Sequence, residues 1–312
     1  MPFNDQILKR LDAALAKRQS LRKITNAMRL VNSLGDGLEG LVLERYDKHF
    51  VAQVFHPRWL QQSASLQSFL TNHFSVEYLI IKDRTQSSSS EVSKIGQQVL
   101  IAKTDSRAMV KENGLVFEVD LNDTLNTGLF LDMRRNRKFI GEHCRNKKVL
   151  NCFAYTCSFG VYAKASGAKE VINVDISKKV LGRGKRNYEL NHLAVGQGEM
   201  VRADAVSFLE RAVKKGNHFD VIILDPPSFA RADGKIFSVK KDLPRMAALA
   251  HRVLKPSGKL FLSTNNSAIT HRHLEGIAKG FKQIQRLGQD VDFTGTGLMK
   301  ESYLVALWAA KS

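Results

Sequence analysis

The most specific chemical signal in the sequence is the run Asp225-Pro226-Pro227-Ser228-Phe229, which directly follows the apolar stretch Val221-Ile222-Ile223-Leu224. Two adjacent prolines fix φ and lack amide hydrogens, so this segment is expected to form a stiff, extended loop with free carbonyl acceptors. Such a loop can hold the edge of a nucleobase, and the ring of Phe229 offers a face on which the base can stack. The run therefore predicts a base-binding loop.

Polar residues also follow three other predicted strands. A small, polar turn from Asn151 to Gly160 follows the first strand, Asp175 follows the second, and Asp204 follows the third. Ligands of open α/β sheets bind beyond the carboxyl ends of the strands, so Asp175 is placed to bind a ribose and Asp204 an adenine edge. Each aspartate taken alone is better explained as a helix cap. Their joint placement at consecutive strand ends favours a nucleoside-binding site.

The first turn lacks the GxGxxG sequence that holds the pyrophosphate of a dinucleotide. This absence disfavours a nicotinamide-dependent oxidoreductase, although Asp175 would serve that cofactor equally well. A non-catalytic RNA-binding module on an enzyme fold is a third interpretation, disfavoured by polar motifs at all four strand ends.

The elements that must position these residues alternate from residue 147 onward. Apolar runs predict strands at 149–152, 170–175, 199–202, 219–224, 259–263 and 303–308, and helical patterns cover 159–166, 177–192, 205–214, 240–254 and 270–282. Alternation of this kind is typical of parallel βαβ units in a doubly wound sheet. The last two strands lie without a strong helix between them, which favours an antiparallel edge.

The preceding part of the chain has a different pattern. An amphipathic helix is predicted from Asn4 to about Arg22, then a strand-rich region, a helix at 59–74, a strand at 78–82 and a hairpin at 107–121. We therefore expect a small α+β domain over residues 1–105, and a hairpin linker with an α/β domain over 106–312.

The charge of the chain indicates a polyanionic partner. Its 312 residues include 48 Lys and Arg against 30 Asp and Glu, a net charge of +18. Basic residues cluster within 1–32, 134–138 and 178–186. A solvated helix face explains any one cluster, but three clusters and a large excess favour phosphate contacts with nucleic acid.

Other classes of protein are disfavoured by composition. No apolar run approaches the roughly 18 residues that span a bilayer, and nothing at the N-terminus resembles a secretion signal. We therefore expect a cytoplasmic protein that does not bind membranes. The three cysteines form no CxxC pair, which argues against a disulfide framework and a metal site.

Four motifs together resemble the bacterial 23S rRNA methyltransferases of the class I S-adenosylmethionine-dependent type. They are the run from Asn126 to Arg137, the turn from Asn151 to Ser158, Asp175, and the run from Asp225 to Phe229. The resemblance implies a Rossmann-like fold, S-adenosyl-L-methionine as cofactor and large-subunit ribosomal RNA as substrate. Many relatives carry an extra N-terminal RNA-binding domain, whereas here only a helix precedes about residue 25.

The resemblance also implies roles for individual residues. Thr127, Phe130, Asp132 and Arg134 would close over the methionine end of the cofactor, and Asn151, Phe153, Tyr155 and Thr156 would line its sulfur and carboxylate. Asp175 would hold the ribose, with Ile176 beside the adenine and Asp204 at its amine, while Asp225, Pro226, Pro227 and Phe229 would flank the target base. One departure is Cys157-Ser158, which stands where the family usually has a glycine pair or a glycine and a small residue.

Chemistry suggests which atom is methylated. Cytosine C5 becomes nucleophilic only after a cysteine thiolate adds to C6, and no cysteine lies in the Pro-Pro loop or after the fifth strand. Guanine N7 has a free lone pair, so alignment and a dry site suffice for its methylation. Asn265, which with Asn266 resembles the guanine-N7 branch of the family, could bind the base edge. We therefore expect guanine N7 as the target, with cytosine C5 as the alternative.

Overall fold

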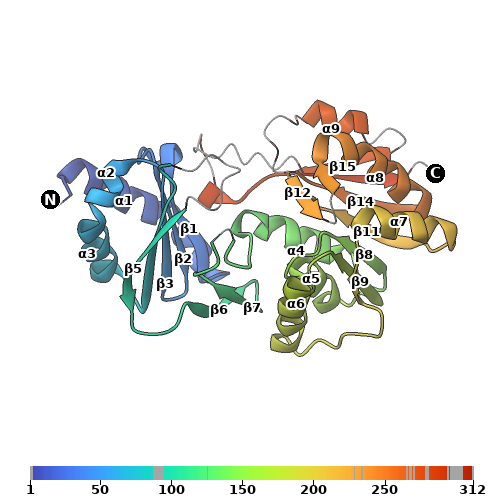
Figure 1. Ribbon diagram of the computed structural model, residues 1–312, viewed down its shortest axis with the longest axis horizontal. Coiled ribbons are helices and arrows are strands. Elements are labelled where there is room, and N and C mark those ends of the chain that lie inside the picture. The colour runs from blue at the N-terminus through green and yellow to red at the C-terminus, as the bar shows by residue number, and fades with distance from the viewer. Residues whose placement is uncertain are drawn as a thin grey trace. The chain divides into compact units, whose positions relative to one another are not determined.

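The computed structural model describes residues 3–86, 95–124, 126–227, 229–232, 235–264, 266, 269, 271–277, 281–293, 295 and 305–310. The chain forms two units, one of Met1–Arg134 with Gln289–Lys300, the other of Arg135–Gly288 with Glu301–Ser312 (Figure 1). The chain thus leaves the first unit, builds most of the second, and returns to the first near its end.

The first unit is built on a five-stranded sheet in the order β1-β2-β3-β4-β5. Its strands are β1 (Ala27–Asn32), β2 (Leu41–Tyr46), β3 (His49–Val54), β4 (Tyr78–Asp83) and β5 (Gly96–Ala102). Its helices are α1 (Asp5–Lys17), α2 (Pro57–Gln61) and α3 (Ser63–His73), with short 3-10 turns η1 (Gln19–Lys23), η2 (Ser33–Asp36), η4 (Leu131–Met133) and η5 (Val291–Phe293).

Strand alternation gives this sheet two different faces. Apolar side chains such as Met28, Leu43 and Phe50 pack with α1, α2 and α3 in one core. The opposite face carries buried polar side chains, among them Glu44 and Lys82. The expected helix does begin after Asn4, whose side chain accepts a hydrogen bond from the amide of Ile7.

The hairpin expected at 107–121 is present as β6 (Arg107–Glu112) and β7 (Leu115–Asp120), with left-handed φ angles at Asn113 and Gly114. It joins the first unit, because Thr25 bridges to Glu112 and the amide of Lys111 donates to Asn26 Oδ1 at 2.6 Å. The division of the chain therefore falls at residue 134 rather than at the boundary expected after residue 105.

The second unit holds a seven-stranded sheet in the order β10-β9-β8-β11-β14-β16-β15. Its strands are β8 (Lys148–Cys152), β9 (Glu170–Asp175), β10 (Met200–Arg202), β11 (Phe219–Leu224), β14 (Leu254–Leu262), β15 (Phe281–Leu287) and β16 (Val305–Ala310). Neighbouring strands from β10 to β14 are parallel, which confirms the expected doubly wound α/β fold.

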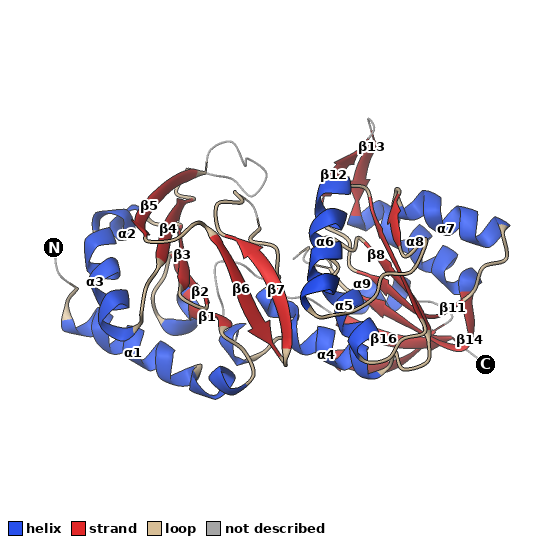
Figure 2. Ribbon diagram, turned by 90° about the horizontal axis from the view of Figure 1, so that it is seen from below, coloured by secondary structure: helices blue, strands red, loops and turns tan. Residues whose placement is uncertain are grey.

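Helices cover both faces of this sheet (Figure 2). Helices α5 (Ser158–Ala165) and α6 (Lys178–Leu190) pack together, and α7 (Ala205–Lys214), α8 (Val239–Val253) and α9 (His271–Ile277) form a separate group. Helix α4 (Arg134–Glu142) precedes β8. Among the described residues, no helix is long and apolar enough to cross a membrane.

Two elements differ from the sequence prediction. The helix expected over 270–282 ends at Ile277, and 281–287 form strand β15, which pairs antiparallel with β16. The antiparallel edge expected from the last two predicted strands is the pairing of β14 with β16. A second hairpin, β12 (Phe229–Ala232) with β13 (Lys235–Ser238), follows the Pro-Pro loop and was not predicted. Both elements depend on pairing partners rather than on local periodicity.

Candidate active site

The ends of four parallel strands meet in register at one edge of the second sheet. Leu224 at the end of β11 pairs with Cys152 in β8 and with Leu262 in β14, and Cys152 pairs with Val174 in β9. The residues that follow, Phe153, Asp175, Asp225 and Ser263, therefore lie side by side. Strand order reverses between β8 and β11, which is where open α/β sheets bind their ligands.

The turn after β8 has an unusual backbone. Phe153, Tyr155 and Cys157 adopt positive φ angles of 55°, 49° and 59°, a conformation that costs a residue other than glycine roughly 1–3 kcal/mol and that persists only where the surroundings impose it. Here the amide of Ala154 donates to Val174 O at 3.0 Å, and Asn187 Nδ2 donates to Thr156 O at 2.9 Å. Strain of this kind is concentrated at ligand sites.

Asp175 connects the turn to β9. Its Oδ2 accepts a hydrogen bond from the amide of Tyr155 at 2.9 Å, and its Oδ1 accepts one from the amide of Ser177 at 2.9 Å. The side chain is partly exposed, as is that of the adjacent Ile176. Each carboxylate oxygen retains a lone pair, so a carboxylate held in this way is suited to accept hydrogen bonds from ribose hydroxyls.

Asn151 and Thr156 are buried, in contrast to the more exposed Phe153 and Tyr155. Asn151 lies within β8, and its Nδ2 donates to Asn173 Oδ1 at 2.9 Å. Asn173 in turn donates to the Tyr188 hydroxyl at 3.0 Å. The side-chain amide of Asn151 therefore supports the turn from within the sheet. The side chains of Phe153 and Tyr155 are more exposed.

Cys157, which stands where the sequence resemblance implies a glycine, is packed against helix α6. A Cβ atom on Gly184 of α6 would lie 2.3 Å from Cys157 Sγ, and one on Gly160 would lie 2.2 Å from Asn173 Oδ1. The absence of a side chain at Gly184 thus leaves the space that the Cys157 side chain occupies.

Asp225 follows β11 and is partly exposed. Burial of its carboxyl raises the pKa of Asp225 to about 6, although a hydrogen bond from the Ser263 hydroxyl and the positive charge of Arg137 both act to lower it. Ser263 and Arg137 are themselves buried. An aspartate with such a pKa changes charge near physiological pH, a property typical of functional sites.

The structure describes only part of the loop, residues 225–229, that the sequence predicts to bind a base. Pro226 is buried and Pro227 is exposed. Phe229 begins β12, but its side chain, Ser228 and Asn265 lie outside the described residues.

Asp204 is exposed and caps α7, since its Oδ1 accepts a hydrogen bond from the amide of Ser207 at 2.8 Å. The helix-cap explanation of Asp204 thus accounts for its observed contact.

The motif from Asn126 to Arg134 lies in the first unit. Thr127 Oγ1 donates to the Tyr46 hydroxyl at 2.9 Å, Asp132 is buried and Phe130 is partly exposed. The Arg134 guanidinium forms ion pairs with Asp292 at 3.0 Å and with Asp290 at 3.2 Å. These contacts fix Arg134 within its own unit.

Three residues that support the site were not predicted from the sequence. Ser263 and Gly184 carry no motif of their own, because they meet their partners only in the folded chain. Arg137 was assigned to a phosphate-binding cluster, and this is wrong, because its side chain is fully buried. The sequence of α4 could have indicated this burial. Arg134 and Arg137 are spaced so that they lie on one face of the helix, whereas Arg135 and Lys138 are exposed.

The cysteines and the surface charge limit the chemistry further. Cys144, Cys152 and Cys157 are all buried, and burial raises the pKa of each thiol, that of Cys144 to about 12. No group of His, Cys, Asp or Glu in the described part of the chain could hold a metal ion.

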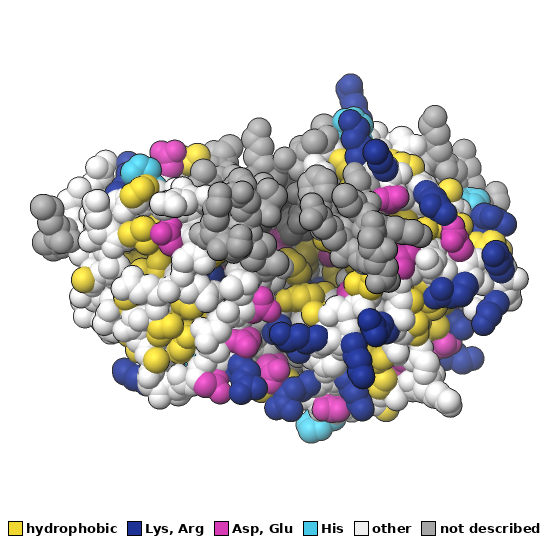
Figure 3. Space-filling view, viewed as in Figure 1, with side chains coloured by type: hydrophobic (Ala, Val, Ile, Leu, Met, Phe, Trp, Pro, Cys, Tyr) yellow, Lys and Arg dark blue, Asp and Glu magenta, His cyan; other side chains and the backbone are white. Residues whose placement is uncertain are grey.

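Lys and Arg side chains gather over the α4–α6 part of the second unit on the face shown in Figure 3.

Comparisons with known proteins agree with this geometry. A family model for S-adenosylmethionine-dependent methyltransferases matches residues 78–293. "Ribosomal RNA large subunit methyltransferase I" of Aeromonas salmonicida is 33% identical over 259 residues, and the match covers 82% of this chain and 65% of that protein. "Ribosomal RNA large subunit methyltransferase K" of Neisseria meningitidis is 33% identical over 80% of this chain and 70% of its own.

Solved structures share the whole architecture. The crystal structure of SMU.776 complexed with SAH has a TM-score of 0.87 and 25% sequence identity, and the match covers 100% of this chain and 83% of that one. A methyltransferase structure from Agrobacterium tumefaciens shares the fold with a TM-score of 0.65 over 87% of this chain and 88% of its own, at 21% identity. The chain spans about two thirds of the length of the first curated relatives, 65% in the Aeromonas protein.

Proposed function

Since the chain belongs to the S-adenosylmethionine-dependent methyltransferase family, we propose that it methylates a base of large-subunit ribosomal RNA, at N7 of guanine. The observation that carries this proposal is the registered row of strand ends at the switch point, with the strained turn, Asp175 and Asp225 side by side. The names of the curated relatives support ribosomal RNA as the substrate, and so does the net charge of +18.

The site fits S-adenosyl-L-methionine. That cofactor supplies an electrophilic methyl group on a positively charged sulfur. Asp175 is held by two amides and would accept hydrogen bonds from the ribose hydroxyls. The turn would line the methionine part with the partly exposed residues Phe153 and Tyr155. Thr127, Phe130 and Asp132 belong to the first unit, and their assignment to the methionine end stays a prediction.

The state of the cysteines supports guanine N7 over cytosine C5. Methylation at C5 requires a thiolate that adds to the base, and all three cysteines of the chain are buried with raised pKa values. The lone pair of guanine N7 would attack the methyl group directly. The N7–methyl bond would form as the sulfur–methyl bond breaks, so that S-adenosylhomocysteine would leave with the bonding electron pair and the purine would gain a positive charge. The Asp225 carboxylate would stabilise that charge and orient the base, with Pro226 and Pro227 shaping the loop.

Two measurements test the proposal together. Modified nucleosides in ribosomal RNA from cells with and without the protein should differ by one 7-methylguanosine. Loss of a 5-methylcytosine instead would refute the assignment of the base. In vitro, Asp225→Ala should abolish transfer of labelled methyl groups while S-adenosylhomocysteine still binds. A variant with full activity would remove Asp225 from the mechanism.

A further inference from the structure

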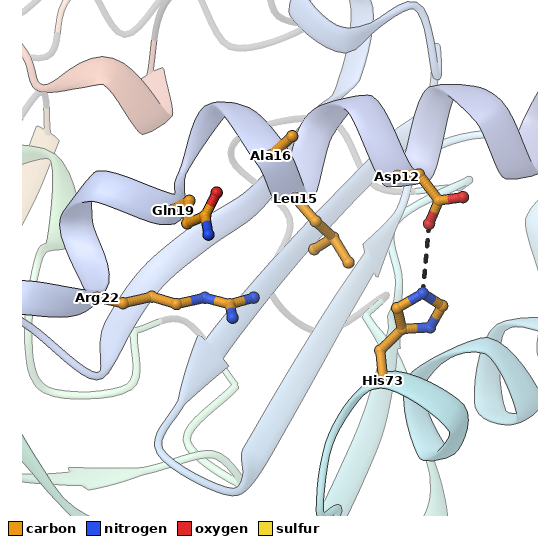
Figure 4. Close-up of a pocket in the computed structure, with 6 residues that line it drawn as sticks. All are labelled: Asp12, Leu15, Ala16, Gln19, Arg22 and His73. Atoms are coloured by element: carbon orange, nitrogen blue, oxygen red, sulfur yellow. Dashed lines mark ion pairs between the residues drawn. The ribbon is translucent and has the colours of Figure 1, made fainter.

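A small pocket opens on the first unit between α1, η1 and α3 (Figure 4). Its volume is about 230 Å³, and it is lined by Asp12, Leu15, Ala16, Gln19, Arg22 and His73. All six residues belong to the N-terminal unit. None of them is among the residues expected to bind the cofactor or the target base.

The pocket has an apolar floor and polar ends. Leu15 is 8% exposed and lies between Arg22, which reaches along the opening from η1, and His73, which faces it from the end of α3 (Figure 4). His73 Nε2 lies 3.3 Å from Asp12 Oδ1, so the carboxylate already has a partner. In the part of the chain that the structure describes, no carboxylate pairs with Arg22.

A second arginine lies next to Arg22. The guanidinium of Arg22 is 5.7 Å from the ring centroid of Phe74, and that of Arg45 is 5.1 Å from the same centroid. Arg45 is oriented by its Nε, which donates to Asp47 O at 2.7 Å. Burial and the positive charge of Arg22 both lower the pKa of Arg45, with Asp47 compensating in part. Two cations on one aromatic ring form a place where an anion would relieve their repulsion.

The volume of the pocket limits the size of the ligand that can bind there. Sites for drug-sized ligands and cofactors occupy about 300–1,000 Å³, so the 230 Å³ pocket suits a single nucleotide better than a whole cofactor. Gln19 offers both donors and an acceptor to a base edge or a ribose, and Leu15 offers an apolar surface. Exposed Lys23 on η1 adds a further positive charge beside Arg22.

We propose that this pocket docks one nucleotide of the RNA substrate, with a backbone phosphate between Arg22 and Arg45 and the nucleoside against Leu15 and Gln19. The inference rests on the proposed RNA substrate but concerns a contact separate from methyl transfer. It gives the N-terminal unit a defined RNA-binding site rather than a diffuse positive surface.

Binding of a labelled RNA fragment of the large subunit tests the proposal. Arg22→Ala and Arg45→Ala should each raise the Kd about five- to twentyfold. Each substitution should also reduce the slope of log Kd against log salt concentration by about one, because RNA binding then releases about one counterion fewer. Arg22→Lys should retain most of the affinity. Arg58→Ala is the matched control, because Arg58 is also exposed in this unit and lies 5.0 Å from the Trp59 ring. It should change the Kd less than about twofold.

Further readouts separate this inference from the proposed function. Thermal unfolding of each variant checks that the unit stays folded. Arg22→Ala should raise the KM for RNA and leave the KM for S-adenosyl-L-methionine and kcat unchanged. Wild-type RNA affinity in the Arg22→Ala, Arg45→Ala double variant would overturn the docking site, and so would guanosine monophosphate or inorganic phosphate binding as tightly as RNA. Absence of methyl transfer by the wild-type protein would count against the proposed function alone.

Discussion

At the scale of single residues, two aspartates that both follow predicted strands have different environments. Asp204 is exposed and caps α7. Asp225 is surrounded by Ser263 and Arg137, and burial raises its pKa to about 6. Both follow predicted strands, so their spacing did not distinguish them. The difference arises because Asp225 follows a central strand and Asp204 follows the short β10 at the sheet edge.

The raised pKa predicts how activity depends on pH. The role proposed for Asp225 requires its carboxylate in the charged form, so kcat/KM for methyl transfer should fall about tenfold per pH unit below about pH 6. The pH profile of methyl transfer to an RNA fragment checks this. Asp225→Asn should show low activity without the pH dependence. A flat wild-type profile between pH 5 and 8 would contradict the assigned role.

The raised pKa of Asp225 also predicts how the free energy of unfolding depends on pH. Asp225 has a higher pKa in the folded protein, about 6, than the ordinary 3.8. The charged carboxylate therefore destabilises the fold above about pH 6, and this cost disappears as the pH falls toward 4. Asp225→Asn should raise the free energy of unfolding by about 1–3 kcal/mol at pH 8. Urea titrations at pH 8 and pH 4 test this, and an equal effect at both values would refute it.

At the scale of elements, the turn after β8 depends on the helices beside it. Helix α6 approaches the turn closely because Gly184 has no side chain at the point where Cys157 Sγ projects. Cys157 holds a left-handed φ of 59° as the residue before α5. The unusual Cys157-Ser158 pair is therefore accommodated by its neighbour, which explains how the turn departs from the family pattern without opening the site.

A pair of substitutions tests this packing. Gly184→Ala places a Cβ within 2.3 Å of Cys157 Sγ and should destabilise the protein by about 1–3 kcal/mol. Cys157→Gly removes the sulfur and suits the positive φ, so the double variant should recover most of the loss. Urea unfolding of the three variants gives the coupling energy. Purely additive effects would show that the two residues do not interact.

At the scale of the whole molecule, the return of the chain to its first unit is fixed by buried charges. Asp292 in η5 is fully buried, pairs with Arg134 at 3.0 Å and accepts a hydrogen bond from the amide of Arg29 at 3.1 Å. Its carbonyl oxygen accepts another from Arg18 at 3.3 Å. Segments from both ends of the chain thus meet within one unit, and the motif residue Arg134 acts as their junction.

The buried ion pair between Arg134 and Asp292 predicts a large effect on the free energy of unfolding. Asp292→Ala would leave the Arg134 guanidinium buried without its main partner, which typically costs about 3–5 kcal/mol. Replacement of both residues by apolar side chains, Arg134→Met with Asp292→Leu, should not recover that loss, because the carboxylates of buried Glu112 and of Asp290 would lose their ion pairs with Arg134. Chemical denaturation measures both variants. A change below about 1 kcal/mol for Asp292→Ala would argue against the junction.

The sequence by itself determined the features that are local along the chain. Alternating apolar runs and helical patterns identified the parallel sheet, and the order of four short motifs identified the family that the comparisons then supported. Asp175 and Asp225 were found because a residue that follows a strand is recognisable without knowledge of its neighbours. The strand-rich region that precedes residue 59 and the strand expected at 78–82 were likewise local features, and they correspond to β1 to β4.

Only the tertiary structure decided the partners of these residues. Ser263 and Arg137 lie 38 and 88 positions from Asp225 along the chain, and Asp292 lies 158 positions from Arg134. Contacts across such separations leave no periodic signal, because they arise when distant segments share one core or one sheet edge. Burial and charge pairing, which set the pKa of Asp225 and fix Arg134, exist only after those segments have met.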